Sequence, residues 1–158
     1  MAAAILSASV TAVMGPIWAS YRQTQVMQQS TAAASLARQL LDEIIAKPLA
    51  DPTTGDISHG PDATQLTRGQ YKLVGDYNGY SDTTSVLTEL DGSAVTWNSG
   101  GIYTRTVKIA YRATPAGSEA ASGDFALVTV SVKAPGGDVV TAQRLVSNFL
   151  RLLLKPTP

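Results

Sequence analysis

The first 21 residues contain no charged side chain, and this run constrains the fold more than any other feature of the chain. The first charge is Arg22, and the run mixes large apolar residues with small Ala, Ser and Gly residues. A helix rises about 1.5 Å per residue, so about 20 residues span the roughly 30 Å hydrocarbon layer of a bilayer. Trp18 and Tyr21, followed by Arg22, match the ring-then-charge pattern of a membrane interface. The run therefore predicts a helix that lies in a membrane or in a bundle of helices.

Two other interpretations of this run stay open. A secretory signal peptide has a basic segment before its apolar part, and no Lys or Arg precedes the run here. A helix buried in a soluble core is the third interpretation, although the extreme N-terminus is an unusual place for a long uncharged core helix. Ser7, Ser9 and Thr11 are compatible with a membrane helix, because their hydroxyl groups can bond back to the preceding turn.

The helix is predicted to continue beyond residue 21 and to end near Ala46. Residues 21–47 contain no Gly or Pro and are rich in the good helix formers Ala, Gln and Leu. Pro48 disfavours helix at the residue before it, which sets the end. The helix then has about 45 residues and is on the order of 68 Å long. Proline removes a backbone hydrogen bond and clashes with the previous turn, so we expect a kink or local unwinding at Gly15 and Pro16.

An apolar stripe follows one face of the second half of this helix. Its members recur at steps of three and four residues, which is the spacing of an amphipathic helix. They are Ala33, Ala37, Leu40, Leu41 and Ile44. Asp42 and Glu43 lie off the stripe, and we expect them on a solvated face, with helix docking or subunit pairing as the alternative. The pattern predicts that residues 1–21 protrude and that residues 22–47 pack on the rest of the chain.

The remaining residues indicate a loop followed by a small β domain. Residues 48–69 are rich in Pro, Gly, Asp and Thr, which is typical of a loop. Residues 70–100 are ambiguous: residues 71–74 could start a short strand, Asn78-Gly79 is a turn signal, and residues 86–90 and 94–97 are short apolar pieces. We assign residues 70–158 as a whole to an antiparallel β domain.

Three strands are predicted in the last third of the chain, at residues 102–113, 124–134 and 139–149. They alternate apolar and polar residues and are rich in β-branched and aromatic side chains. Residues 135–138 form a tight turn between the second and third strands. Consecutive strands joined by turns make an antiparallel meander, and one of its faces can cover the helix stripe. The predicted fold class is therefore α+β.

Composition excludes several classes of function. The chain has no Cys, which excludes disulfides, thiolate zinc sites and cysteine catalysis. Its one histidine, His59, lies between Ser58 and Gly60 and is expected to be a solvated loop residue rather than a ligand. The 12 Lys and Arg residues balance the 12 Asp and Glu residues, so no basic excess points to nucleic acid. No Gly-rich phosphate loop is present. We expect no catalytic residues and no cofactor, and the chain is predicted not to be an enzyme.

A weak calcium signal lies in the segment GDYNGYSD. Asp76, Asn78 and Asp82 offer alternating oxygen ligands next to a Gly turn, as calcium loops do. The segment lacks the spaced bidentate Glu of an EF-hand. A hairpin or a turn closed by an Asp or Asn side chain is the favoured interpretation.

The long helix with its early proline and the small sheet together resemble the type IV pilin and pseudopilin family. Over residues 3–48, AAAILSASVTAVMGPIWASYRQTQ is similar to the family's transmembrane helix beyond its first residues. LARQLLDEIIAKPLADP is similar to the helix exit of minor pilins of the type IV pilus modification (PilV-like) group and of type II secretion pseudopilins. DFALVTVSVKAPGGDVVTAQRLVSNF is similar to their last hairpin. Residues 49–100 carry no such resemblance.

The resemblance implies a structural subunit of a type IV pilus or a type II secretion system. It would be a single-pass protein of the bacterial inner membrane with its C-terminal domain in the periplasm, or part of a filament. Implied partners are other pilin or pseudopilin subunits, the inner-membrane assembly platform and the lipid bilayer. The small residues allow close approach of neighbouring helices. The residues expected to serve in assembly or in the membrane are Ala4, Ile5, Ala8, Val10, Ala12, Val13, Gly15, Pro16, Ile17 and Trp18.

Family precursors start with a short basic leader that ends in Gly and carry Glu at the fifth mature position. The chain starts about where the eighth mature residue would be, so we expect the true start to lie upstream. Prepilin peptidase is a further implied partner if the leader is present there. The alternative function is a membrane-anchored periplasmic binding or interaction domain outside any filament, with residues 49–100 as its binding surface.

Overall fold

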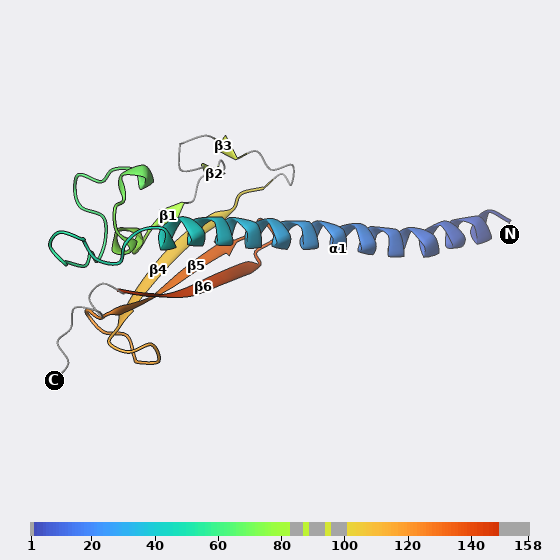
Figure 1. Ribbon diagram of the computed structural model, residues 1–158. Helices are drawn as coiled ribbons and strands as arrows, with labels where there is room; N and C mark the ends of the chain where they lie inside the picture. Colours follow the sequence, from blue (N-terminus) through green and yellow to red (C-terminus); the bar gives the residue numbers. More distant parts are fainter. Residues whose placement is uncertain (1, 83–86, 89–93, 96–100, 149–158) are drawn as a thin grey trace.

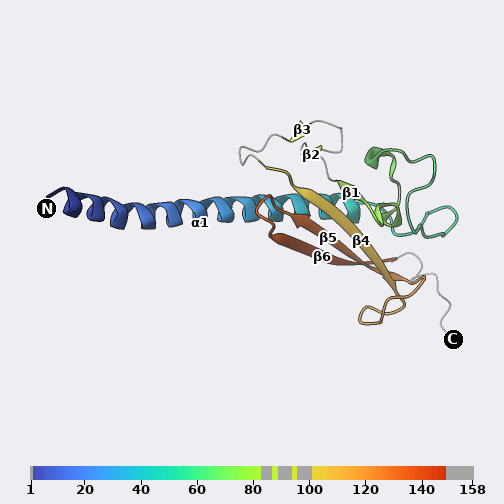
Figure 2. The ribbon, with the colours of Figure 1, turned by 180° about the vertical axis from the view of Figure 1, so that it is seen from behind.

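A computed structural model describes residues 2–82, 87–88, 94–95 and 101–148 of the chain. One long N-terminal helix packs on a four-stranded antiparallel sheet, so the fold is α+β (Figure 1). The sheet lies against the C-terminal half of the helix, and the N-terminal half extends away from it. The same arrangement is visible from behind in Figure 2.

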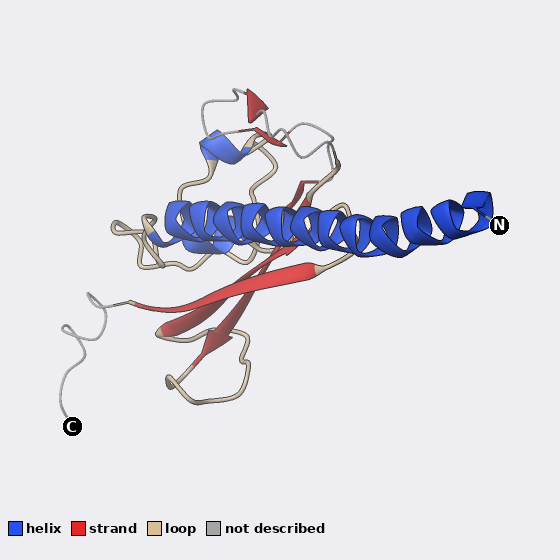
Figure 3. Ribbon diagram, turned by 90° about the vertical axis from the view of Figure 1, so that its right-hand side faces the viewer, coloured by secondary structure: helices blue, strands red, loops and turns tan. Residues whose placement is uncertain are grey.

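Helix α1 covers Ala2–Ile45 as one continuous element of 44 residues. Its end agrees with the prediction, because Pro48 follows shortly after and Ala46 and Lys47 close the last turn through bonds to the carbonyls of Asp42 and Ile44. The expectation of local unwinding at Gly15 and Pro16 is wrong. Figure 3 shows a gently curved helix without a sharp kink.

The physical reason lies in the surroundings of the proline. Pro16 removes the donor to one carbonyl only, and the turns before and after it keep their own hydrogen bonds. A Cβ placed on Gly15 would meet nothing within 4 Å, so this part of the helix is not packed against anything that would bend it.

The main sheet has the strand order β1-β4-β5-β6. The three long strands are β4 (Thr104–Arg112), β5 (Phe125–Lys133) and β6 (Val139–Ser147), which confirms the predicted meander. Strand β1 (Ser81–Asp82) extends the sheet beyond β4 and was not predicted. Strands β2 (Leu87–Thr88) and β3 (Ala94–Val95) form a separate small pair. The other residues of the predicted apolar pieces 86–90 and 94–97 lie outside the described part.

Two turns behave as their sequences predict. Gly137 has φ +94° in the turn between β5 and β6, and its N–H donates to the carbonyl of Ala134. Gly79, after Asn78, has φ +79°. Both are conformations that glycine adopts without strain. The strand considered possible at residues 71–74 does not form. The 3-10 helix η1 (Arg68–Gln70) precedes this segment, and a second one, η2 (Val74–Tyr77), begins at its last residue.

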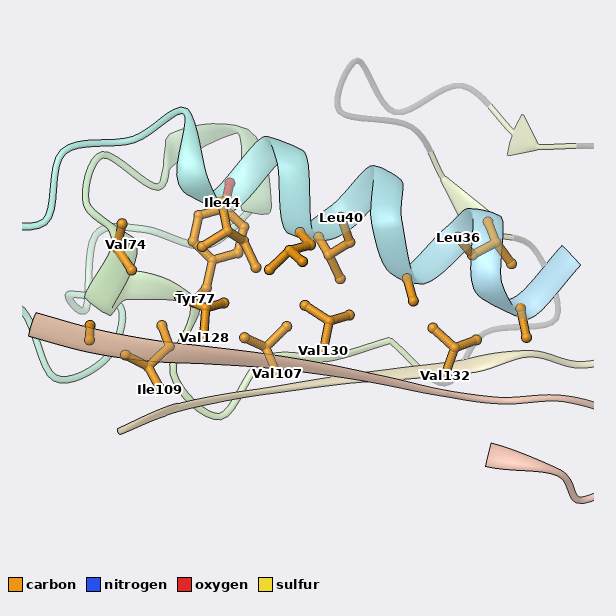
Figure 4. Close-up of a cluster of buried hydrophobic side chains, with 14 of the residues drawn as sticks. Leu36, Leu40, Ile44, Val74, Tyr77, Val107, Ile109, Val128, Val130 and Val132 are labelled. Atoms are coloured by element: carbon orange, nitrogen blue, oxygen red, sulfur yellow. The ribbon is translucent and has the colours of Figure 1, made fainter. Parts of the chain in front are cut away.

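The core lies between α1 and one face of the sheet (Figure 4). Leu36, Leu40 and Ile44 point from the helix toward Val128, Val130 and Val132 of β5, and all six are fully buried. The alternation in β4 buries Tyr103, Arg105, Val107, Ile109 and Tyr111, as predicted for that face. Tyr77 of η2 fills the space next to Ile44. This packing fixes the C-terminal half of α1 and leaves the N-terminal half without a partner within the described residues.

Candidate assembly surface of the projecting helix

The projecting half of α1 exposes a stripe of large apolar side chains. These are Met14, Ile17, Trp18 and Tyr21, which we call the arm stripe; each is more than half exposed, Trp18 at 62%. Their spacing of three, four and seven residues places them on one helical face. A run of large exposed apolar side chains of this kind is normally buried, which makes it the strongest candidate for a contact surface.

The arm stripe does not continue the face that packs on the sheet. At about 100° per residue, its centre lies roughly a quarter turn from that of the buried stripe formed by Ala33, Leu36, Leu40 and Ile44. A helix that docks on the arm stripe would therefore approach α1 beside the sheet rather than in line with it. Val26 and Met27, at 47% and 60% exposure, add apolar surface between the two halves.

The structure places the predicted assembly residues along α1. Ala4, Ile5, Ala8, Val10, Ala12 and Val13 are helical, and their side chains are outside the described part. Gly15, Pro16, Ile17 and Trp18 are exposed on the arm. The predicted list of assembly residues did not include Met14 or Tyr21, although the sequence pattern had already placed Tyr21 at a membrane interface and their helical spacing from Ile17 and Trp18 was a signal that could have added both. The residues predicted to pack on the sheet, Ala33, Ala37, Leu40, Leu41 and Ile44, are all buried.

A polar contact holds the end of α1 against the loop that follows. Glu43 Oε1 accepts a hydrogen bond from the Tyr77 hydroxyl at 2.7 Å and lies 3.2 Å from Arg68 Nε. The expectation that Glu43 is on a solvated face is wrong, because η1 and η2 fold over this side of the helix. Burial, with the Glu43 carboxylate as acceptor, strongly raises the pKa of Tyr77, so its hydroxyl stays a donor. Asp42 is exposed, as expected.

Asp76 organises the loop between α1 and the sheet. Its Oδ2 accepts bonds from the backbone N–H groups of Lys72 (2.8 Å) and Leu73 (3.0 Å) and from Gln65 Nε2 (2.9 Å). Burial acts to raise the pKa of this carboxyl, but the hydrogen bonds outweigh it and the pKa is lowered. Gly75 is required beside it, because a Cβ there would overlap the Ser58 carbonyl oxygen. The Tyr111 hydroxyl donates to that same oxygen.

The three calcium candidates have separate partners. Asp76 accepts the loop hydrogen bonds described above. Asn78 Oδ1 accepts a hydrogen bond from the Ile109 N–H at 3.0 Å, and Asp82 forms a buried ion pair with Arg105 at 2.5 Å. The structure thus does not bring their oxygen atoms together around one ion. Within the described residues no group of three or more His, Asp or Glu side chains is placed to hold a metal.

A hollow of about 630 Å³ opens beside this loop. Its walls are mostly polar and include Asp51, Asp56, His59, Asp62 and Lys72. The backbone N–H groups of Thr53 and Thr54 lower the pKa of Asp51. His59 is exposed at the rim, where its ring packs edge-on against Tyr111, with 5.1 Å between the centroids.

No family model, no curated protein and no solved structure matches the chain. Across the described residues, no helix combines the length and the apolar character needed to cross a membrane.

Proposed function

We propose that the protein is a structural subunit of a noncovalent filament of the pilin or pseudopilin kind, in a type IV pilus or a type II secretion system. The observation that carries the proposal is the arm stripe. A sheet domain holds one half of α1, while the other half presents Met14, Ile17, Trp18 and Tyr21 to the surroundings.

This arrangement suits assembly for two physical reasons. Burial of apolar surface contributes about 25 cal/mol per Å², so covering large side chains such as Trp18 and Ile17 favours association. On a different face of the arm, the small residues Gly15 and Ala19 let a second neighbouring helix backbone approach closely. The sheet domain then forms the outside of the assembly. Residence of α1 in the bacterial inner membrane before assembly, with the sheet in the periplasm, belongs to the same proposal and rests on the sequence resemblance.

The test uses the full chain, purified in detergent and then dialysed free of it. We expect the wild type to assemble into elongated particles that sediment and that are visible by negative-stain microscopy. Ile17→Lys should stay in the supernatant. Leu66→Lys is the matched control, because Leu66 is also a large apolar residue, 85% exposed, but lies in the loop. Sedimentation of Ile17→Lys to the same extent as Leu66→Lys would contradict the proposal.

A second candidate function is a membrane-anchored periplasmic binding domain, favoured by the polar hollow beside the Asp76 loop. In that case α1 serves as an anchor only. Replacing residues 2–28 with an unrelated transmembrane helix would then preserve the binding function of the protein in the cell. A filament subunit would lose its function in the same exchange.

A further inference from the structure

The outer sides of the long strands β4 and β6 differ in the backbone hydrogen bonds that they make. The edge of β4 is covered along its length: Val107 bonds with Tyr80 and Gly79, the Ile109 N–H with Asn78, and the Tyr111 carbonyl with Ala120. Ser81 and Asp82 of β1 pair with the start of the same strand. The edge of β6 has no such cover within the described residues.

The backbone groups that β6 offers can be identified from the register. The Ala134 N–H donates to the Asp138 carbonyl and the Asn148 N–H to the Asp124 carbonyl, both at 2.8 Å. Hydrogen-bonded pairs alternate along an antiparallel ladder, so the even-numbered residues of β6 bond to β5. The odd-numbered residues therefore turn their N–H and C=O groups outward. They are Val139, Thr141, Gln143, Leu145 and Ser147.

This edge also lacks the features that usually protect a free strand. Its nine residues pair one-to-one with β5, so there is no bulge, and they include no proline and a single charge, Arg144. Val139 is 60% exposed and Leu145 is 40% exposed. A regular, weakly charged edge of this length is a template for pairing with another strand.

We propose that β6 pairs antiparallel with β6 of a second copy of this chain, with Gln143 opposite Gln143 on a twofold axis. The edge is self-complementary in this register. The outward residues are symmetric about Gln143, so Thr141 faces Leu145 of the second copy and Val139 faces Ser147, and every outward donor meets an acceptor.

The side chains support the same register. On the helix-facing side, Val140 lies opposite Val146 of the second copy, which is a favourable β-branched pair. Arg144 of one copy lies opposite Ala142 of the second copy, and not opposite the second copy's Arg144. Like charges are therefore not directly opposed. The twofold axis is perpendicular to the joined sheet, so both α1 helices lie on one face and the two arms point in opposite directions. Because the arms point in opposite directions, they cannot both enter one bilayer, so this dimer is a state of the chain outside the membrane and uses a surface separate from the arm stripe.

Cysteine cross-linking tests the proposal directly, because the chain has no native Cys. Directly opposed residues of a hydrogen-bonded pair have Cα atoms about 5.5 Å apart, which a disulfide can bridge. With oxidised glutathione, Gln143→Cys should therefore form a covalent dimer about tenfold or more faster than Thr106→Cys, an exposed control on β4.

Two further variants test the register and the backbone bonds. Thr141→Cys alone should not cross-link, whereas a mixture of Thr141→Cys and Leu145→Cys proteins should. Thr141→Pro removes an outward N–H without breaking the β5 ladder, and should abolish cross-linking through Gln143→Cys, while Thr141→Val retains it. Circular dichroism checks that the proline variant is folded. Equal rates for Gln143→Cys and Thr106→Cys, or efficient cross-linking of Thr141→Cys alone, would overturn the proposal.

Discussion

Asp76 shows how one carboxylate determines the path of a loop that carries little secondary structure. It is only 2% exposed, and its Oδ2 holds Lys72, Leu73 and Gln65 in place. Because its pKa is lowered in the folded protein, the ionised form stabilises the fold above the unfolded pKa of about 3.9. That contribution is lost as the pH falls through the lower folded pKa.

We expect Asp76→Asn to lower the free energy of unfolding by about 1–3 kcal/mol at pH 7, because a charged acceptor of buried donors is lost. The difference from the wild type should begin to narrow below about pH 4, where the unfolded wild type takes up the proton, and it should disappear as the pH falls through the lower folded pKa of Asp76. Urea denaturation at pH 7 and pH 3 measures both effects. Asp62→Asn is the control, since Asp62 is an exposed aspartate beside the same hollow. An unchanged difference between the two pH values would contradict the argument.

At the scale of the element, α1 is one helix with two environments. Its C-terminal half is held by the core, where Leu40 is 1% exposed. Its N-terminal half has no packing partner among the described residues, although Ile17 is equally apolar. The helix continues through this half because the docked half supplies the costly nucleation step, and each further turn adds its own hydrogen bonds.

The loss of a large side chain should lower the free energy of unfolding in the docked half of α1 and leave it nearly unchanged in the projecting half. Leu40→Ala should destabilise the folded chain by about 2–5 kcal/mol, because it leaves a cavity against β5. Ile17→Ala should change the free energy of unfolding by less than about 0.5 kcal/mol, because the side chain packs on nothing in the single copy. Denaturation in detergent, which prevents association, makes this comparison. A loss of stability with Ile17→Ala similar to that with Leu40→Ala would show that the arm is packed.

At the scale of the whole molecule, the fold presents two separate surfaces for association. The arm stripe lies on the projecting half of α1, and the open edge of β6 lies on the sheet domain (Figure 1). An isologous edge contact closes after two copies, whereas a head-to-tail helix contact can extend without limit. The first would give dimers and the second would give filaments.

Because the two surfaces are separate, their variants should not affect each other. Ile17→Lys should leave the Gln143→Cys cross-linking rate unchanged within about twofold, since distant sites act additively. Thr141→Pro should leave sedimentation after detergent removal unchanged. Both properties are measured on the same full-length preparations. Loss of both properties in Ile17→Lys would mean that one surface serves both contacts.

The sequence by itself determined the long helix and the three long strands. An uncharged N-terminal run, a stripe at helical spacing, Pro48 and three alternating segments were enough for the helix, the meander and the α+β class, because these signals are local. Tertiary structure alone decided the rest. It placed Glu43 under Arg68 and Tyr77, paired Asn78 with Ile109 and Asp82 with Arg105, and left β6 open while covering β4. Such contacts join residues far apart in the chain, and no short-range pattern encodes which of them meet.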